Sequence, residues 1–413
     1  MILKTYRYRI YPDVEQKKFL ERHFGSCRFV YNHFLALRSS AWKERRESIG
    51  WMQSQAMLPK LKADNPWLKE INSQSLQCSL QNLEKAYKMF FKKLAEYPRF
   101  HKKQGRQSFT VPQHFLVLNN WLKIPKLKSG IRVRMHRPPL GKAKTLTIIK
   151  ETSGKYYVSI VCECEPVMLP PTTNTVGVDL GLNDIAVLSS GEKINHPRWF
   201  YKIERRLARK QRQLSRRKKG SKNRQRARLQ VALLHEKIKN QRQDFLHKLS
   251  HRLIIENQEV SIEGLRVRNM TKNRHLAKAI SDSGWAELAR QLQYKANWYG
   301  RTVKVIDTFA PSSKKCSVCG FINRELKLSQ RIWECPNCKT VHDRDINAAV
   351  NIEQIGRDTP ELTPVERRAS TVSTFSIKQA LSKKQETLAS NKDARELIPV
   401  SMSQMGQNRL FRE

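Results

Sequence analysis

The sequence lacks any long apolar run. Its 413 residues contain no uninterrupted apolar stretch of the 18 or more residues that a membrane-spanning helix needs. The opening residues, MILKTYRYRIYP, contain no apolar segment of the kind found in secretory signal peptides. We therefore expect a protein of the cell interior that has no membrane partner.

Acidic residues are also scarce. Asp and Glu total 36 against 79 Lys and Arg, which gives a formal net charge of +43. Repulsion among so many like charges opposes a compact state unless a polyanion neutralises them. Hydrophobic residues still make up 39% of the chain, and its length suggests about two or three domains. The composition predicts a folded protein whose partner is a nucleic acid.

Cysteines number eight, and a disulfide framework would be unusual in an intracellular chain of this length. Cys162 and Cys164 lie in an alternating strand pattern and are expected to fill a core. Four thiolates at C-x2-C-x15-C-x2-C spacing can close a tetrahedral zinc site with no open coordination position. The pattern therefore predicts a structural zinc ion that replaces a hydrophobic core in this segment. The four residues are Cys316, Cys319, Cys335 and Cys338.

The first part of the chain combines a strand pattern with helical patterns. Residues 1–11 alternate as a strand, and Asp13 with Gln16 forms a capping-box signature for the helix that follows. That helical pattern reaches about residue 46, with a break expected near Gly25. A further helix with one apolar face is predicted over 73–95.

From 96 to 170 the periodicity becomes that of strands. Two of the alternating runs are joined by TSG, which is a hairpin signal, and a small barrel is predicted. The most basic block follows at 201–250, with 18 Lys or Arg residues and three acids. Its pattern breaks around RRKKGSKNRQR, which predicts a helical hairpin. Charge runs are usually solvated faces, but this density favours a phosphate-binding surface.

Three acids occupy unusual positions. Asp179 lies between Gly177 and a second glycine on one face of a predicted strand, where the glycines would leave room for a ligand backbone. Glu263 lies in a buried-strand pattern, where an acid is costly unless it is paired or binds a cation. Asp345 lies in the first turn of a helix that Asp343 can cap, so Asp345 is spare.

Each acid alone has a structural explanation, such as a strand-end turn or a helix cap. Together, a strand Asp, a strand Glu and a helix Asp are oxygen ligands suited to Mg²⁺ or Mn²⁺. Two such ions about 4 Å apart activate a water and stabilise the leaving oxygen in phosphodiester cleavage. We expect the three side chains to meet within a few ångströms, at the floor of a positive cleft.

The sequence resembles the TnpB (OrfB) proteins of insertion-sequence transposons, which are relatives of the compact type V CRISPR effectors. The motifs span roughly residues 1–355 and include YRYRIYP, GVDLGL, SRRKKGS, SIEGLRV, CSVCGF, WECPNC and HDRDINAA. The resemblance implies an RNA-guided DNA endonuclease whose guide RNA derives from the transposon end and whose target is double-stranded DNA. It gives catalysis and Mg²⁺ binding to Asp179, Glu263 and Asp345, and zinc binding to the four paired cysteines.

The fold implied by this resemblance is α/β and multidomain. It would combine a wedge-like β-barrel carrying a helical recognition insertion with an RNase H-like (RuvC) nuclease domain carrying a zinc-ribbon insertion. A disordered tail, a prokaryotic cytoplasmic location and a monomer in the ribonucleoprotein are also expected. The implied ranges are 1–11 and 96–170 (barrel), 12–95 (recognition insertion), 171–308 and 342–356 (nuclease, with the basic hairpin 201–250), 309–341 (zinc module) and 357–413 (tail).

Nucleic-acid contacts are predicted on two elements. Gln77 and Lys85, on helix 73–95, are candidates for reading a short motif beside the target, since Gln can form two hydrogen bonds with adenine. A Gln that merely faces solvent explains that residue equally well. Six cations near the bend of the basic hairpin are expected to bind phosphates with strong salt dependence. They are Arg216, Arg217, Lys218, Lys219, Arg224 and Arg226.

Two other functions stay open. A nuclease-silent, RNA-guided DNA-binding regulator would share the fold, although all three acidic positions are acidic here. A transposase or its DNA-binding accessory protein is the other, because residues 13–46 can be read as a helix-turn-helix. The sequence has no His-x-His motif, which argues against a transposase of the tyrosine type. An acidic-triad transposase remains compatible with the three acids.

Overall fold

The computed structural model describes residues 1–118, 120–327 and 329–359. The chain divides into two units, Met1–Gly356 and Arg357–Glu413. From residue 360 onward the predicted tail lies outside the described residues. Within the described ranges, no helix combines the length and the apolar character that crossing a bilayer requires.

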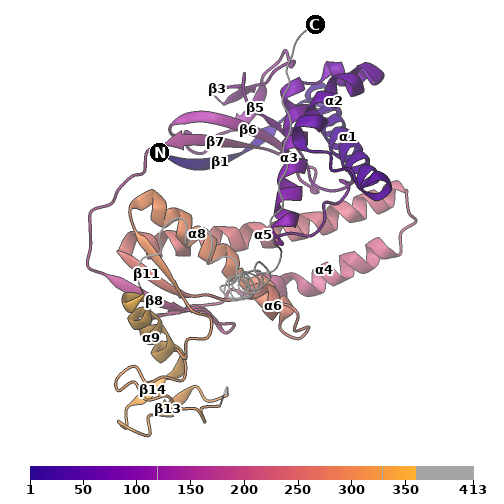
Figure 1. The fold of residues 1–413 in the computed structure, drawn as a ribbon. Helices are drawn as coiled ribbons and strands as arrows, with labels where there is room; N and C mark the ends of the chain where they lie inside the picture. Colours follow the sequence, from indigo (N-terminus) through magenta and orange to yellow (C-terminus); the bar gives the residue numbers. More distant parts are fainter. Residues whose placement is uncertain (119, 328, 360–413) are drawn as a thin grey trace, which may run out of the picture. The chain divides into compact units, whose positions relative to one another are not determined.

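Seven antiparallel strands form the sheet of the N-terminal region, in the order β2-β6-β7-β1-β5-β4-β3 (Figure 1). The alternation predicted for residues 1–11 is confirmed, since Tyr6, Tyr8 and Ile10 are buried. The predicted TSG hairpin joins β6 to β7. Cys162 on β7 is fully buried, as expected, whereas Cys164, also expected in the core, is only half-buried. The strands are β1 (Ile2–Tyr11), β2 (Gln107–Val111), β3 (Leu116–Leu118), β4 (Trp121–Lys123), β5 (Ile131–Arg134), β6 (Lys142–Lys150) and β7 (Tyr156–Cys164).

This sheet differs from the closed barrel that was predicted. β2 and β3 stand at the two ends of the strand order, and no pair joins them among the described strands. β3 and β4 are only three residues long. At the other end, Phe109 of β2 packs against the rings of His23 and Phe24. Helical side chains thus cover this end of the sheet, so closure is not needed to protect it.

Helices fill the chain between β1 and β2. The predicted capping box is confirmed, because Asp13 accepts from the Gln16 N–H and the Gln16 side chain accepts from the Asp13 N–H. The predicted break near Gly25 is wrong. Burial of Phe24 and Cys27 offsets the roughly 1 kcal/mol that a glycine costs inside a helix. The helices are α1 (Val14–Arg45), α2 (Trp51–Asp64), the 3-10 helix η1 (Pro66–Glu70) and α3 (Ser73–Phe91).

A second, mixed sheet has the order β10-β9-β8-β11-β12. β8, β11 and β12 run parallel, whereas β9 pairs antiparallel with both β8 and β10. Apolar residues of β8 and β11 share one core with α5 and α8. The strands are β8 (Thr175–Asp179), β9 (Asp184–Leu188), β10 (Lys193–Asn195), β11 (Glu259–Glu263) and β12 (Thr302–Ile306). The helices of this region are α4 (Trp199–Ser215), α5 (Lys222–Glu256), α6 (Val267–Met270), α7 (Ala277–Ser283), α8 (Trp285–Tyr299) and α9 (Arg344–Asp358).

Helix α9 packs closely on the opposite face of the second sheet. A Cβ atom at Gly177 would lie 2.0 Å from the carbonyl oxygen of Ala349, and one at Gly356 would lie 1.9 Å from the hydroxyl oxygen of Ser261. The prediction that Gly177 leaves room for a ligand is therefore wrong, because α9 occupies that room. The close approach of α9 sets where its first turn lies relative to the strand ends.

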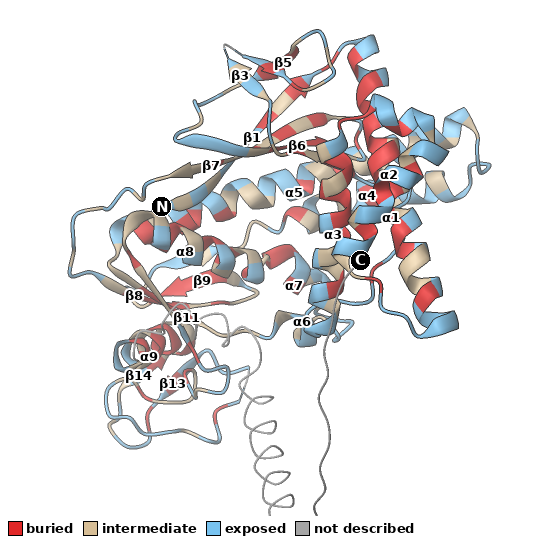
Figure 2. Ribbon diagram, turned by 45° about the horizontal axis from the view of Figure 1, so that its top comes forward, coloured by how far each residue is buried: buried red, intermediate tan, exposed pale blue. Residues whose placement is uncertain are grey.

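The predicted basic hairpin is confirmed as α4 and α5. Leu207 on α4 and Ile238 on α5 are buried in the shared core. Glu236, one of its few acids, accepts from the Tyr157 hydroxyl at 3.0 Å and pairs with Lys155 at 2.9 Å, which ties α5 to the first sheet. Most of the remaining surface of both helices is exposed or half-buried (Figure 2).

The chain segment between β12 and α9 contains a small core of its own. Trp333 and Leu326 are buried with two of the paired cysteines, Cys316 and Cys335. The antiparallel strands β13 (Ile332–Glu334) and β14 (Val341–Asp343) close this segment, and the chain passes from β14 directly into α9. This continuity joins the cysteine-rich segment covalently to the helix that carries Asp345.

Candidate functional site

Asp179 and Glu263 lie side by side at the ends of neighbouring parallel strands. Asp179 is the last residue of β8, and Glu263 is the last residue of β11. The register pairs Val178 with Ile262, so the next residue of each strand is an acid. Ligands bind at the carboxyl ends of parallel strands in open α/β sheets, and this is the edge that both acids occupy.

Asp345 belongs to the first turn of α9. Asp343 caps this helix, as predicted, accepting from the N–H groups of Asp345 at 3.0 Å and Ile346 at 3.1 Å. Lys193 pairs with Asp343 at 2.6 Å. Burial raises the pKa of Asp343, but these hydrogen bonds outweigh it, and the net pKa lies below its usual range. The capping role thus falls to Asp343, and Asp345 is left for another purpose.

Two of the acids act electrostatically on the third, Asp179. Burial, and after it the charges of Glu263 and Asp345, raise the pKa of Asp179 from 3.8 to about 8. Burial also raises the pKa of Glu263, against the opposing effect of a hydrogen bond that the Ser312 hydroxyl donates to it at 2.9 Å. The fold therefore brings together the acids that the sequence singled out.

Arg331 is a further member of this site. One guanidinium nitrogen lies 3.0 and 3.1 Å from the two carboxylate oxygens of Asp345. Within the described ranges, only the cysteine cluster brings three or more candidate ligand atoms within 4.8 Å of one another. The three carboxyl groups are therefore not all within 4.8 Å of one another in this structure. Hard oxygen donors suit Mg²⁺, and a cation here would counter the repulsion that raises the pKa of Asp179, so the donor set fits a divalent ion.

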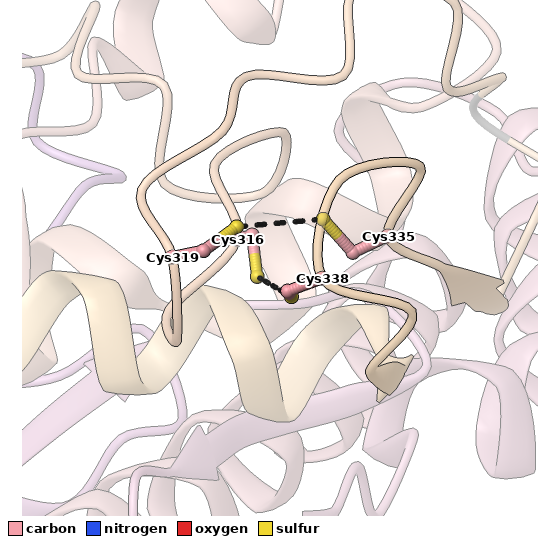
Figure 3. A group of neighbouring side chains, drawn as sticks. All are labelled: Cys316, Cys319, Cys335 and Cys338. Carbon is pink, nitrogen blue, oxygen red and sulfur yellow. Dashed lines mark hydrogen bonds between the residues drawn. The ribbon is translucent and has the colours of Figure 1, made fainter.

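The four paired cysteines form one cluster, with the two C-x2-C turns facing each other (Figure 3). The Sγ atoms of Cys316 and Cys338 lie 3.6 Å apart, as do those of Cys319 and Cys335. All four sulfurs lie within 4.8 Å of one another. This arrangement fits a tetrahedral zinc ion with four thiolate ligands, and no ligand position is left for substrate.

Groups around the cluster act on its thiols in opposite directions. Hydrogen bonding by Asn337 is the main cause that lowers the pKa of Cys319, to about 6, whereas burial raises the pKa of Cys316 to about 11. His342 is buried, and its Nε2 lies 3.1 Å from the sulfur of Cys316. Its ring packs against Trp333. A histidine N–H beside a coordinating sulfur is the kind of outer contact that orients metal ligands.

The residues predicted to contact nucleic acid differ in their surroundings. Gln77 is half-buried and lines a cavity of about 780 Å³ together with Trp51 and Lys62. Lys85 is exposed on the same helix, α3. At the hairpin bend, five of the six predicted cations are exposed, namely Arg216, Arg217, Lys218, Lys219 and Arg226.

Arg224 is the exception among those six cations. Its guanidinium donates to the carbonyl oxygens of Leu214 and Arg217, both at 2.8 Å. These carbonyls lie at the end of α4, so Arg224 closes the hairpin from within. Its position therefore gives it a structural role that the charge pattern did not distinguish.

Sequence reasoning missed the residues that support the acids. Ser312 binds Glu263, Arg331 pairs with Asp345, and Asn347 and Asn351 bind the chain beside Ser312. One signal was available for the two asparagines. They are four residues apart in α9, on a helix whose other buried positions are mostly small or apolar.

Three family models match parts of the chain. One from OrfB of IS605, described as "Probable transposase", matches residues 159–274. A second, described as "Cas12f1-like, TNB domain", matches 285–352, and a third, described as "Helix-turn-helix domain", matches 1–47. In the structure, 1–47 holds β1 and a single continuous helix, α1. The helix-turn-helix reading of residues 13–46 thus agrees with the description of this family model, while the structure has one helix without an internal turn over Val14–Arg45.

Known proteins match most of the chain. A "Putative RNA-guided DNA endonuclease" of Streptomyces pristinaespiralis is 42% identical over 361 residues, which are 86% of this chain and 90% of that protein. The "Putative RNA-guided DNA endonuclease InsQ" of Escherichia coli K12 is 35% identical over 375 residues, 86% of this chain and 92% of that protein. A cryo-EM structure of a Cas12f1–sgRNA–target DNA complex covers 86% of this chain and 99% of its own, at 16% identity and a TM-score of 0.35. Identity to the two curated relatives over most of both lengths shows that the chain belongs to the TnpB (OrfB) family of IS605-type insertion sequences.

Proposed function

We propose that the chain is an RNA-guided DNA endonuclease that cleaves double-stranded DNA by metal-dependent phosphodiester hydrolysis. The observation that carries this proposal is the grouping of Asp179, Glu263 and Asp345, from three distant segments, around one sheet edge. The mixed five-stranded sheet with helices on both faces supports an RNase H-like (RuvC) assignment. The guide and the substrate class come from the names of the two curated relatives.

Asp179, Glu263 and Asp345 would hold divalent ions, Mg²⁺ or Mn²⁺. Two such ions, when bound, would activate a water and stabilise the leaving oxygen of the phosphodiester. The chain's own groups prepare the site. Ser312 fixes one oxygen of Glu263, and Arg331 offsets the charge of Asp345. Burial, and after it the charges of Glu263 and Asp345, raise the pKa of Asp179 to about 8. Asp179 therefore stays protonated below about pH 8 until a positive charge favours its ionised form.

The cysteine cluster would hold structural zinc. Four thiolates saturate the ion, so it would take no part in hydrolysis. Its role would be to give a segment with a very small apolar core a defined shape. The segment leads directly into α9, so the same ion would support the helix that carries Asp345.

The exposed hairpin cations support binding of the guide RNA or of the guide–target heteroduplex through phosphates. Base pairing would supply most of the sequence specificity, with the protein reading a short motif beside the target. Gln77 is the proposed reader of that motif, because its amide lines a cavity that also contains an aromatic and a basic side chain. Lys85, exposed on the same helix, would contact phosphate.

The deciding experiment compares divalent-dependent cleavage by the wild-type chain, by Asp179→Asn and by Asp244→Asn. Asp244 is an exposed acid on α5 that pairs with Lys248, so its variant controls for the loss of one negative charge. The chain is purified with the RNA that accompanies it, and that RNA is sequenced to define the matching DNA target. Asp179→Asn should bind RNA normally and cut nothing, whereas Asp244→Asn should cut as the wild type does.

Other results would select the remaining functions. Cleavage by Asp179→Asn at the wild-type rate would end the catalytic role of Asp179. Guide-dependent DNA binding without cleavage by the wild type in Mg²⁺ would select the nuclease-silent regulator. Copurification of random cellular RNA, together with strand transfer, would select a transposase or its accessory protein.

A further inference from the structure

Two buried asparagines of α9 hold the chain segment that precedes the first cysteine turn. Asn347 donates to the carbonyl oxygen of Lys315 at 2.7 Å and accepts from the N–H of Ser317 at 2.9 Å. Asn351 donates to the carbonyl oxygens of Ser312 at 2.8 Å and Lys315 at 2.6 Å. Residues 312–317, which we call the first knuckle segment, are thus fastened to α9 by side-chain amides.

The same segment reaches the acid site and the cysteine cluster. At its start, the buried Ser312 donates its hydroxyl to Glu263 at 2.9 Å. Toward its end, Cys316 is fully buried and belongs to the cysteine cluster. The helix that fastens the segment also carries Asp345, two residues before Asn347 and six before Asn351. Glu263 and Cys316 are thus both connected to a segment that α9 holds, and α9 itself carries Asp345.

The two asparagines are poor choices if only packing mattered. Asn347 is 2% exposed and Asn351 is 0% exposed, and Asn has a lower helix propensity than Ala or Leu. The Oδ1 atom of Asn351 is buried, and no hydrogen-bond partner is found for it among the described residues. A leucine would fill a similar volume without that unpaired oxygen, whose burial is itself costly. What only the amides provide is attachment of the knuckle segment.

We propose that Asn347 and Asn351 are positioning residues that couple the cysteine cluster to the acid site, so that order in the first knuckle segment sets where Ser312 holds Glu263. The inference rests on the proposed nuclease function only for its effect on metal-dependent cleavage. Its effect on zinc retention is independent of that function. In this arrangement the zinc site is part of what shapes the acid site.

The test uses the full chain with its accompanying RNA and three variants. Asn351→Leu removes two hydrogen bonds to the knuckle segment. Ser312→Ala removes only the hydroxyl that binds Glu263. Gln354→Ala is the matched control: it also removes one α9 hydrogen bond to the segment, the 3.3 Å contact with the Ser317 carbonyl oxygen, but that bond is exposed, so water can replace it. Two quantities are measured: the rate at which a chelator removes zinc, and the Mg²⁺ concentration for half-maximal cleavage.

Asn351→Leu should release zinc about tenfold faster than the wild type, as expected for losing two buried hydrogen bonds. It should also need several-fold more Mg²⁺, even with zinc in excess. Ser312→Ala should show the higher Mg²⁺ requirement but release zinc at the wild-type rate. Gln354→Ala should change neither. If Asn351→Leu does not fold by circular dichroism, Asn347→Ala, which also loses two hydrogen bonds to the segment, takes its place.

The proposal is overturned if the asparagine variant releases zinc at the wild-type rate. It is also overturned if excess zinc returns its Mg²⁺ requirement to the wild-type value, because the asparagines would then act on zinc affinity alone. A wild-type chain that cuts no DNA would defeat the nuclease assignment instead. In that case the zinc-release rates, with Mg²⁺-dependent thermal unfolding in place of cleavage, still decide the coupling.

Discussion

The cysteine cluster and the acid site are built in opposite ways. The four sulfurs already lie within 4.8 Å of one another, because two short turns bring each pair together and one small core joins the turns. The three acids come from β8, β11 and α9, and they are not gathered so tightly. Burial, and after it repulsion from Glu263 and Asp345, raises the pKa of Asp179. A site formed by residues close in sequence, such as the cysteine cluster, depends mainly on local turns. A site formed by tertiary packing, such as the acid site, depends on every element that positions its residues.

Removing one acid should give the largest difference between the effects on the acid site and on the cysteine cluster. Glu263→Gln keeps the size of the side chain and its contact with Ser312, but it removes the negative charge. Cleavage should fall by at least about 100-fold, the order expected for losing one catalytic group. Zinc content, measured by a metallochromic dye after denaturation, should be unchanged. A variant that cuts normally would show that the acids do not act together.

Removing one sulfur should affect both centres. Cys335→Ser takes a buried ligand from a site whose zinc affinity contributes roughly 10 kcal/mol in isolated zinc-finger peptides. Zinc should be lost, and cleavage should be lost with it because the segment leads into α9. Cys162→Ser is the control, since Cys162 is equally buried but lies in the first sheet. Metal content and cleavage are measured on the same samples. Full cleavage by zinc-free Cys335→Ser would show that the acid site does not depend on the cysteine cluster.

Gly177 offers a way to disturb the acid site through the contact between β8 and α9. In Gly177→Ala the new Cβ would meet the Ala349 carbonyl at 2.0 Å, which should lower the free energy of unfolding by about 1–3 kcal/mol, as overpacking does. Gly105→Ala is the control, because its Cβ would meet its nearest neighbour at an ordinary 3.7 Å. Chemical denaturation measures both. Equal stability of the two variants would mean that α9 does not lie against the sheet as described.

A further effect should appear in the dependence of stability on pH. Asp179 has a pKa of about 8 in the folded chain and 3.8 as its ordinary value, so the folded state binds the extra proton between these limits. Stability should therefore fall as the pH rises from about 4 through 8 without divalent ions. Asp179→Asn, or added Mg²⁺, should flatten that slope. Thermal unfolding across this range tests it, and an unchanged slope in Asp179→Asn would assign the titration to another group.

The smallest effect concerns a surface that belongs to neither centre. Replacing Arg216, Arg217, Lys218 and Lys219 by Gln should reduce the slope of log affinity for RNA against log salt by about 3, at about 0.7 for each phosphate contact with a single strand. Arg224→Gln should instead lower the thermal stability of the hairpin, because Arg224 binds the carbonyls that end α4. Filter binding at several salt concentrations distinguishes the two effects. A changed slope for Arg224→Gln alone would reverse the roles given to them.

Local patterns were the most predictable part of this molecule. The C-x2-C spacing located the cysteine cluster, and the capping box located the start of α1, because both depend on neighbours along the chain. The acids were predictable as residues, since an acid at the end of a buried strand needs an explanation. The approach of Asp345 to the other two acids was not, because it depends on the packing of α9 against the sheet, which no periodicity reports.

The wrong predictions share one cause. The sequence shows where a residue leaves space or conformational freedom, but it does not show which part of the fold packs there. Gly177 promised room, and α9 occupies that room. Gly25 predicted a break, and burial on both sides carries the helix through it. The predicted barrel needed a pair between β2 and β3, and helical side chains cover the β2 end instead. Arg224 was predicted to bind phosphate like the other five cations, but its guanidinium donates to the carbonyl oxygens of Leu214 and Arg217.

Helix α9 is enclosed on several sides at once. Gly177 and Gly356 bring it against the sheet, Asn347 and Asn351 fasten the first knuckle segment to it, and β14 runs into it without a connecting loop. A helix held this way makes a poor hinge. Any opening movement of the acid site would then have to be accommodated by elements other than α9.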